Sequence, residues 1–263
     1  MTDKPSTDPA TRGGIVDTLK TVFWALIIAG AFRTLLFQPF WIPSESMKDT
    51  LLIGDYLFIN KMAYGYSRYS CPFDACPISG RIFGAEPARG DVVVFSHPRS
   101  HEVMVKRLIG LPGDLVQVRS GLLYINDALA PQEPDGTFSE VMELQGSMAN
   151  RPRCENGQVP DGALCTRSRA IETLPNGVKH PVLNIEDMGY GDNTPVFAVP
   201  ADHYFMMGDN RDNSLDSRFP NGVGFVPYEN LIGRADMALF SSAGSSLFAF
   251  WTWRADRFFK LID

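Results

Sequence analysis

Two serines stand two positions apart in the segment IPSESMKDTLLIGDYLFINKMAYG, residues 42–65, which also holds two lysines and no histidine. A serine hydroxyl becomes a strong nucleophile when a nearby base takes its proton. The chain has four histidines, and none stands in a motif typical of a Ser-His-Asp triad or of a G-x-S-x-G elbow. A lysine is therefore the base to look for.

A lysine can act as that base when burial in apolar surroundings lowers its pKa until the amine is neutral near the working pH. Lys106 has the most suitable setting, inside the apolar run VMVKRLIGLPGD, whereas Lys48 and Lys61 stand in more polar positions close to turns. An isolated lysine in a strand more often points to solvent. The residues alone thus suggest a Ser/Lys pair without establishing it.

The elements that must position these residues are short and strand-like. The segments DYLFINKMAY, DVVVFSHP, EVMVKRLIGL and DLVQVRSGLLYIN are dense in β-branched residues and bounded by Gly, Pro and Asp. Residues 128–196 are polar and turn-rich, which is typical of an inserted small domain, and the strand pattern resumes at HYFMMGDNRDNS. We predict a mainly β protein with an antiparallel β catalytic core, an inserted smaller β and loop domain, and one preceding transmembrane helix.

That helix is predicted for residues 21–42, TVFWALIIAGAFRTLLFQPFWI. The run is long enough to cross a hydrocarbon core of about 30 Å. Trp24 and Trp41 would lie roughly 25 Å apart on it and mark the two membrane interfaces. Arg33 inside the run and Pro39 near its end both weigh against a full-length helix.

A cleaved export signal is the alternative for this region, because Ala29, Gly30 and Ala31 match the A-x-A cleavage pattern. The apolar run TLLFQPFWI continues past that point and favours an anchor. Three Lys and Arg residues precede the run, so the N-terminus is expected in the cytoplasm and the bulk of the chain outside it.

The cysteines agree with export to an oxidising compartment. Cys71 and Cys76 form one close pair and Cys154 and Cys165 another, each in a loop rich in Pro or Gly, so two disulfides are possible. Zinc binding is the competing interpretation, but neither spacing is C-x-x-C and histidines are few. We expect no metal and no cofactor.

Composition argues against one class of partner, nucleic acid. The net charge is -6 and the pI is about 5.3, whereas binding to nucleic acid requires a basic face. A chain of 263 residues is ample for a sizeable core. The sequence contains no evidence on oligomeric state.

Four segments carry a family resemblance. IPSESMKDTLLIGDYLFINKMAYG, RGDVVVF, VKRLIGLPGD and FMMGDNRDNSLDSR occur in the order of the conserved boxes of bacterial type I signal peptidases, the membrane-bound enzymes also called leader peptidases. P-S-x-S-M alone would be a weak signal, but the ordered set is a strong one. The chain therefore resembles this family of Ser/Lys serine endopeptidases.

The resemblance implies a role for each matching residue of the dyad. The serine directly before the methionine is the family's nucleophile, which is Ser46 here. Ser44 matches the side-chain donor that joins the nucleophile's backbone N–H in an oxyanion hole. Lys106 matches the general base.

The last box implies three supporting residues. Ser214 resembles the serine that hydrogen-bonds and orients the lysine, and Asp216 and Arg218 match the acidic and basic pair that braces the site. Considered singly, Ser44 could be a turn residue, Ser214 a surface hydroxyl, and the charged pair a surface ion pair of little energetic weight. The order of the boxes favours the functional interpretation.

The resemblance also implies the substrate, which is the signal peptide of an exported preprotein with small residues at positions −1 and −3. Such a peptide would bind in an extended conformation with its side chains in shallow apolar pockets. Residues that match the family's positions around these pockets are Ile42, Pro43, Met47, Leu51, Met104 and Val105. Met104 stands where an aromatic residue is expected, which leaves the depth of the pocket open.

The expected organisation has six parts: a cytoplasmic tail at 1–20, the transmembrane anchor at 21–42, core segments at 43–127 and 197–240, the insert at 128–196, and a C-terminal interfacial segment at 241–263. The last part, with FAFWTWRADRFFKLID, suits an interfacial helix on the lipid bilayer, with a buried tail as the alternative. The expected location is the bacterial inner (plasma) membrane, in a single pass, with the catalytic domain on the periplasmic or outer face.

Two other functions remain open from the sequence. A different Ser/Lys processing peptidase, of a conjugation-associated or self-cleaving type, would share the dyad and act on another substrate. The self-cleaving repressor type should carry a DNA-binding module, and none is visible. An exported β-rich binding module without enzymatic activity would leave the ordered boxes unexplained.

Overall fold

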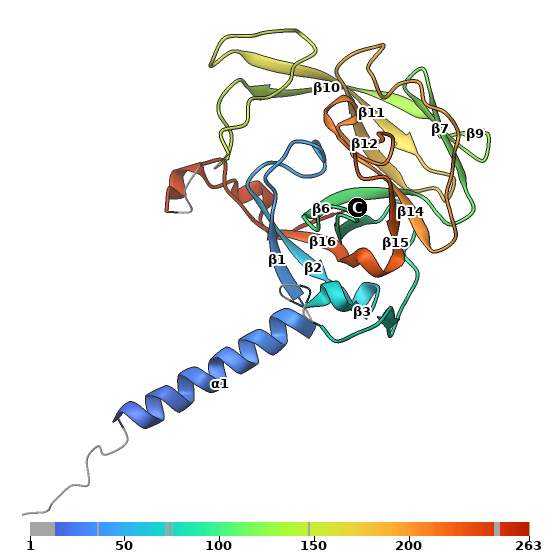
Figure 1. The fold of residues 1–263 in the computed structure, drawn as a ribbon. Helices are drawn as coiled ribbons and strands as arrows, with labels where there is room; N and C mark the ends of the chain where they lie inside the picture. Colours follow the sequence, from blue (N-terminus) through green and yellow to red (C-terminus); the bar gives the residue numbers. More distant parts are fainter. Residues whose placement is uncertain are drawn as a thin grey trace, which may run out of the picture.

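The computed structural model describes residues 14–35, 37–71, 74, 76–146, 148–244 and 248–262, with residues 31–35, 37 and 38 described by their backbone alone. Figure 1 shows one long N-terminal helix that extends away from a body built of β-sheets. The mainly β prediction is therefore confirmed.

A curled antiparallel sheet of eight strands forms the centre of that body. Its order is β1 (Phe37–Trp41), β2 (Asp55–Asn60), β16 (Leu231–Ser241), β5 (Val92–Ser96), β6 (Val103–Gly110), β14 (His203–Met207) and β15 (Phe225–Pro227), with β17 (Lys260–Leu261) paired to β16. Three of the four segments predicted as strands correspond to β2, β5 and β6 of this sheet. β5 and β6 are neighbours, and β16 lies between β2 and β5.

Three smaller sheets complete the body. They consist of β10 (Gln132–Val141), β11 (Leu164–Thr173) and β12 (Lys179–Asn184); β13 (Phe197–Ala198), β7 (Leu115–Arg119), β8 (Leu122–Ile125) and β9 (Ala128–Leu129); and β3 (Tyr66–Ser67) with β4 (Arg81–Ile82). Short 3-10 helices are η1 (Lys61–Ala63), η2 (Arg68–Ser70), η4 (Arg211–Asn213), η5 (Tyr228–Asn230), η6 (Phe250–Thr252) and η7 (Ala255–Arg257). Within the predicted insert, β10, β11 and β12 form a sheet of their own, which we call the insert sheet, whereas β9 pairs with β8.

The continuous apolar run of β5 is explained by burial on both of its faces. Val92 and Val94 belong to one apolar cluster, and Val93 and Phe95 belong to another. A strand with only one face buried would alternate apolar and polar residues. Beside it, β6 pairs antiparallel and in register with β5, which places Lys106 opposite Val93.

The serine segment is fixed to the core by apolar side chains. Ile42, Met47 and Leu51 are fully buried with residues of β2, β5 and β16. Full burial of one such side chain contributes about 1.5–3 kcal/mol. The loop that carries the two serines therefore rests on the core of the eight-stranded sheet.

The N-terminal helix differs from its predicted bounds. Helix α1 spans Gly14–Leu35, and β1 then begins at Phe37 and pairs with β2. The prediction that Trp24 and Trp41 lie on one helix is wrong, because Trp41 is opposite Tyr56 in the sheet. Pro39 gives the reason: it cannot donate in a helix and disfavours helical backbone before it.

Many side chains of α1 are both apolar and exposed, including Phe23, Trp24, Leu26 and Ile28. Among the described residues, no helix combines the length and apolar composition needed to cross a membrane. Ala29 and Gly30 lie within the helix, and the side chain of Arg33 lies outside the described part.

The C-terminal segment is not the interfacial helix that the sequence suggested. Its described part, 248–262, contains η6, η7 and β17. Arg257 is buried and binds both carboxylate oxygens of Asp55 and the carbonyl of Thr50. These contacts hold the segment against the body, while Phe250 and Trp251 stay exposed.

Candidate active site

The two residues predicted to form the dyad meet in the structure. Lys106 Nζ on β6 lies 2.5 Å from Ser46 Oγ and donates its other described hydrogen bond to Val105 O at 3.1 Å. The exposed fractions are 3% for Lys106 and 7% for Ser46. This is the geometry that transfer of a proton from the hydroxyl to the amine requires.

The surroundings of Lys106 favour its neutral form. Burial lowers its pKa to about 8, Asp216 and Asp209 oppose that shift, and Arg218 adds to it. The charged amine loses hydration in this setting, which is the usual cause of such a shift. A large fraction of the amine is therefore neutral at a mildly alkaline pH.

Ser44 lies on the solvent side of the nucleophile. Its Oγ is 3.4 Å from Ser46 Oγ, and the residue is exposed whereas Ser46 is buried. An exposed hydroxyl beside the attacking oxygen can donate to an oxyanion that forms there. The carbonyl of Ser46 points the other way and accepts a hydrogen bond from Asn210 N at 3.1 Å.

The backbone approach behind Ser46 requires a glycine. A Cβ at Gly208 would lie within 2.5 Å of the Ser46 carbonyl oxygen and of the Ser214 side chain. Real Cβ atoms do not come so close, so another residue here would force the loop away. The glycine of GDNRDNS thus lets the last box reach the serine loop.

Asp216 and Arg218 form a buried bidentate ion pair. Arg218 Nε and Nη2 each lie 2.9 Å from a carboxylate oxygen of Asp216, and Gly208 N donates to the same carboxylate at 3.0 Å. Burial raises the pKa of Asp216, but Arg218 outweighs it and the net shift is downward. The pair is not the weak surface pair that the sequence left open, since both side chains are buried.

Ser214 lies close to Ser46, since its side chain and the Ser46 carbonyl oxygen both surround the position that a Cβ at Gly208 would take. Its Oγ is buried and makes no hydrogen bond with any part of the chain that the structure describes. The hydrogen bond to Lys106 that the resemblance implied is therefore absent from this arrangement of the side chains.

Four of the six residues predicted to shape the substrate pockets belong to one apolar cluster of the core. Ile42, Met47, Leu51 and Val105 are buried in one apolar cluster, with Pro43 and Met104 partly exposed. The buried members can set the floor of an apolar pocket, and the partly exposed ones can touch a bound side chain.

Sequence reasoning missed a second set of buried charges, which is centred on Arg107, the residue directly after Lys106. Arg107 Nε and Nη2 each lie 2.9 Å from an oxygen of Asp209, and Thr50 Oγ1 donates to that carboxylate at 2.6 Å. His180 is buried nearby, with its two ring nitrogens 3.2 Å from Glu172 and 3.4 Å from Asp209. The signal was present in the boxes, where Arg107 follows the lysine and Asp209 follows the glycine.

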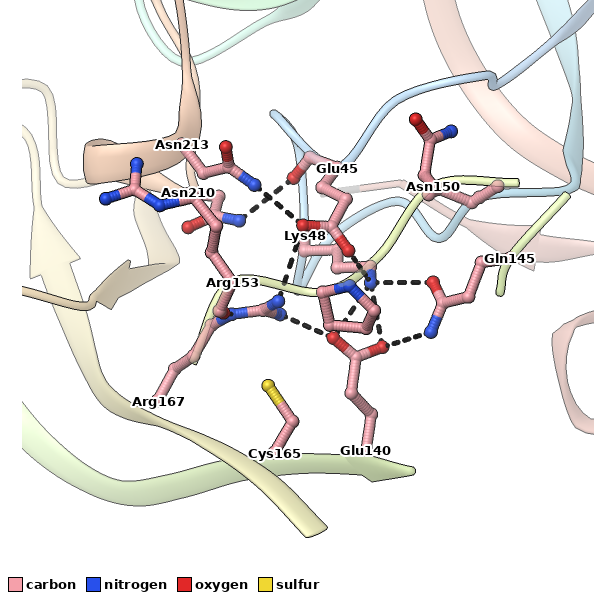
Figure 2. A network of polar contacts seen from close by, with 12 residues as sticks. Glu45, Lys48, Glu140, Gln145, Asn150, Arg153, Cys165, Arg167, Asn210 and Asn213 are labelled. Atoms are coloured by element: carbon pink, nitrogen blue, oxygen red, sulfur yellow. Dashed lines mark hydrogen bonds and ion pairs between the residues drawn. The ribbon is translucent and has the colours of Figure 1, made fainter. Parts of the chain in front are cut away.

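Sequence reasoning also missed the charges that flank the nucleophile. Glu45 and Lys48 are buried and contact Glu140 and Arg167 of the insert sheet (Figure 2). The sequence analysis placed Lys48 in a polar position near a turn. Charged residues are rarely buried unless paired, and the partners lie far away in the sequence.

The cysteines pair as the spacing allowed. The structure has one disulfide between Cys71 and Cys76 and another between Cys154 and Cys165. Among the described residues, no group of three or more His, Cys, Asp or Glu side chains is arranged to hold a metal ion.

Known proteins match the chain over most of its length. The family model described as "Signal peptidase, peptidase S26" matches residues 15–240. Signal peptidase I of Rickettsia akari is 40% identical over 245 residues, covering 88% of this chain and 84% of the relative. Signal peptidase I of Rickettsia typhi is 41% identical over 228 residues, covering 83% and 78%.

A solved signal peptidase I from Enterococcus faecalis V583 is 27% identical and covers 57% of this chain and 97% of its own, with a TM-score of 0.30. At that score the structural likeness supports no argument.

A buried serine hydroxyl beside a buried lysine amine, on an antiparallel β core, fits the class of serine endopeptidases. The family match then identifies the lineage: the chain belongs to the S26 family of signal peptidases. Proteins of this family are associated with the membrane.

The acid limb of the pH profile should follow the charges around Lys106. A general base must be neutral to accept a proton, so with Lys106 in the role predicted for it kcat/KM should rise with pH through about 8. Asp216→Asn removes a charge that raises the pKa of Lys106 and should move the limb to lower pH; Arg218→Gln should move it to higher pH. Profiles measured with a peptide substrate would contradict this account if both variants kept the wild-type limb.

Proposed function

We propose that this chain removes N-terminal signal peptides from exported preproteins by a Ser46/Lys106 mechanism. The observation that carries the proposal is the 2.5 Å contact between Lys106 Nζ and Ser46 Oγ in a buried setting. The relatives named signal peptidase I support the substrate class. Small residues at −1 and −3 of the signal peptide are the proposed recognition elements.

The first chemical step forms an acyl-enzyme. Ser46 Oγ attacks the scissile carbonyl carbon while Lys106 accepts the hydroxyl proton. The carbonyl oxygen becomes an oxyanion, which accepts hydrogen bonds from the Ser46 backbone N–H and from the Ser44 hydroxyl. Such a donor contributes about 3–4 kcal/mol. The ammonium of Lys106 then protonates the leaving amine, which is the N-terminus of the mature protein.

The second step regenerates the enzyme. Lys106 is neutral again and takes a proton from a water that attacks the ester carbonyl. The second tetrahedral intermediate collapses, Ser46 Oγ leaves and takes the proton from Lys106, and the signal peptide departs with a carboxylate. Asp216 and Arg218 act on the pKa of the amine in opposite directions, the carboxylate raising it and the guanidinium lowering it.

The substrate pockets would be formed by residues on both sides of the dyad. An extended peptide would place its −1 and −3 side chains against Met104 and Pro43, above the buried floor of Ile42, Met47 and Leu51.

We place the enzyme at the bacterial plasma membrane, with its N-terminus in the cytoplasm and its catalytic body on the outer or periplasmic face. The exposed apolar side chains of α1 need a cover, and lipid provides one. Phe250 and Trp251 in the C-terminal segment provide a second lipid contact of interfacial character. The two cysteine pairs suit the oxidising side of that membrane.

Three variants should separate the roles of the dyad. Ser46→Ala and Lys106→Met should each lower kcat by about 10⁴-fold or more, because neither partner acts without the other. Ser44→Ala should retain partial activity, about 10²–10³-fold below wild type, because one oxyanion donor remains. Cleavage of a signal-peptide substrate ending in Ala-x-Ala by detergent-solubilised protein measures all three. An active Lys106→Met variant would show that the base lies elsewhere.

The C-terminal lipid contact can be tested by fluorescence. In vesicles whose acyl chains carry bromine, part of the tryptophan emission should be quenched, and Trp251→Phe should remove some of that quenched part. Vesicles without bromine supply the control, because there the difference in emission between wild type and Trp251→Phe gives the total emission of Trp251, one of four tryptophans in the chain. If the emission lost in the variant was never quenched, Trp251 does not contact lipid.

A further inference from the structure

Four charged side chains meet beside the nucleophile and take no part in the chemistry described above. Two of them, Glu45 and Lys48, come from the serine loop; the other two, Glu140 on β10 and Arg167 on β11, come from the insert sheet. We call these four residues the flanking cluster. Figure 2 shows their side chains converging at one point between the loop and the sheet.

Lys48 is the centre of the cluster and is 1% exposed. Its Nζ donates to Glu45 Oε1 at 2.7 Å, to Glu140 Oε2 at 2.7 Å and to Gln145 Oε1 at 2.9 Å. All three hydrogens of the ammonium therefore have an acceptor. Gln145 Nε2 in turn donates to Glu140 at 2.8 Å, which fixes that carboxylate.

Arg167 closes the cluster from the other side and is fully buried. Its Nη1 is 2.7 Å from Glu140 Oε1, and its Nη2 is 3.4 Å from Glu45 Oε2. Its Nε donates to Arg153 O at 2.6 Å, next to the disulfide-bonded Cys154. Two acids and two bases thus balance, and the cluster adds no net charge to the site.

The backbone around Ser46 is also held by three asparagine side chains from outside the serine loop. Asn150 Nδ2 donates to the carbonyl of Pro43 at 2.8 Å. Asn210 Nδ2 donates to the carbonyl of Glu45 at 3.2 Å, and Asn213 Nδ2 donates to its carboxylate at 2.6 Å. Glu45, directly before Ser46, and Lys48, two positions after it, are therefore both fixed by side chains from outside the serine loop.

Stability alone is a weak reason for such a cluster. Replacing buried ion pairs by apolar residues of similar volume is often neutral or stabilising, because desolvation offsets the Coulomb attraction. What these four paired charges do supply is a single geometry, since any shift of the loop leaves a charge unpaired. Three of the four are buried, and the side chain of Glu140 is 13% exposed. The cluster thus fixes the serine loop, whose Ser46 hydroxyl must lie within hydrogen-bond distance of Lys106. Lys106 itself belongs to the eight-stranded sheet and not to the insert sheet.

We infer that the flanking cluster positions the nucleophile. The insert sheet binds Glu45 and Lys48 and thereby holds Ser46 Oγ within hydrogen-bond distance of Lys106, with the Ser46 N–H placed to donate to the oxyanion. The inference rests on Ser46 as the nucleophile of the proposed function. Glu45, Lys48, Glu140 and Arg167 are positioning residues under this scheme, since they act through the backbone of the loop and touch no reacting atom.

The test compares Lys48→Met, Glu140→Gln and the double variant as full-length protein in detergent. Each single change should lower kcat by about 10- to 100-fold with KM within about twofold, because small displacements of a reacting group cost rate while binding is kept. The double variant should lose no more than Lys48→Met alone, because the cluster acts as a unit. The acid limb near pH 8 should stay in place, since none of the four residues is among the groups that set the pKa of Lys106.

The matched control is Arg151→Gln, which removes an exposed ion pair with Asp161 on the same insert and should leave kcat unchanged. Rates are expressed per folded molecule, so that a loss of stability does not imitate a loss of kcat. If Lys48→Met does not fold, Glu140→Gln, which keeps the shape of the side chain, decides the matter alone.

Folded variants with kcat within twofold of wild type would overturn the inference, as would losses that are additive or that move the acid limb. These outcomes differ from failure of the proposed function. In that case wild type would cleave no signal peptide, or Ser46→Ala would cleave it as well as wild type.

Discussion

A lysine amine must remain neutral next to a serine inside a protein, and the rest of the structure follows from this constraint. Neutrality requires removal of water, because desolvation is the largest of the causes that bring the pKa of Lys106 down to about 8. Yet the same burial makes every nearby charge costly unless it is paired. The charges around the dyad accordingly occur as closed sets: Asp216 with Arg218, and Asp209 with Arg107.

The fold solves this by bringing three distant segments to one place. The serine loop rests on the eight-stranded sheet through apolar side chains, β6 carries the lysine within that sheet, and the last box passes behind both at Gly208. The insert sheet then reaches the loop from outside through Glu140 and Arg167. Apolar packing thus holds the serine loop against the core, and ion pairs with the insert sheet fix its orientation.

Much of this architecture was readable from local patterns. The runs of β2, β5 and β6 have the residues of buried strands, and the ordered boxes identified Ser46 and Lys106 through their family resemblance. The helix end was misjudged because the apolar run through Trp41 outweighed the signal of Pro39, although residues 37–41 are needed to extend the sheet. The flanking cluster was beyond local reasoning, because Lys48 and Glu140 are 92 residues apart and each alone looks like a surface charge.

The spread of the site along the chain has a consequence for biosynthesis. Lys106 follows Ser46 by 60 residues, and Asn213 follows Glu45 by 168. When the serine loop has just been synthesised, the nascent chain therefore has Ser46 but not yet Lys106. After Lys106 has been added, it still has none of the charged residues that shift the pKa of that lysine. Contacts of such long range are slow to form, because closing the loop between the two residues costs entropy first. The site can therefore be complete only after most of the chain has been synthesised, and a partly synthesised chain is expected to be inactive.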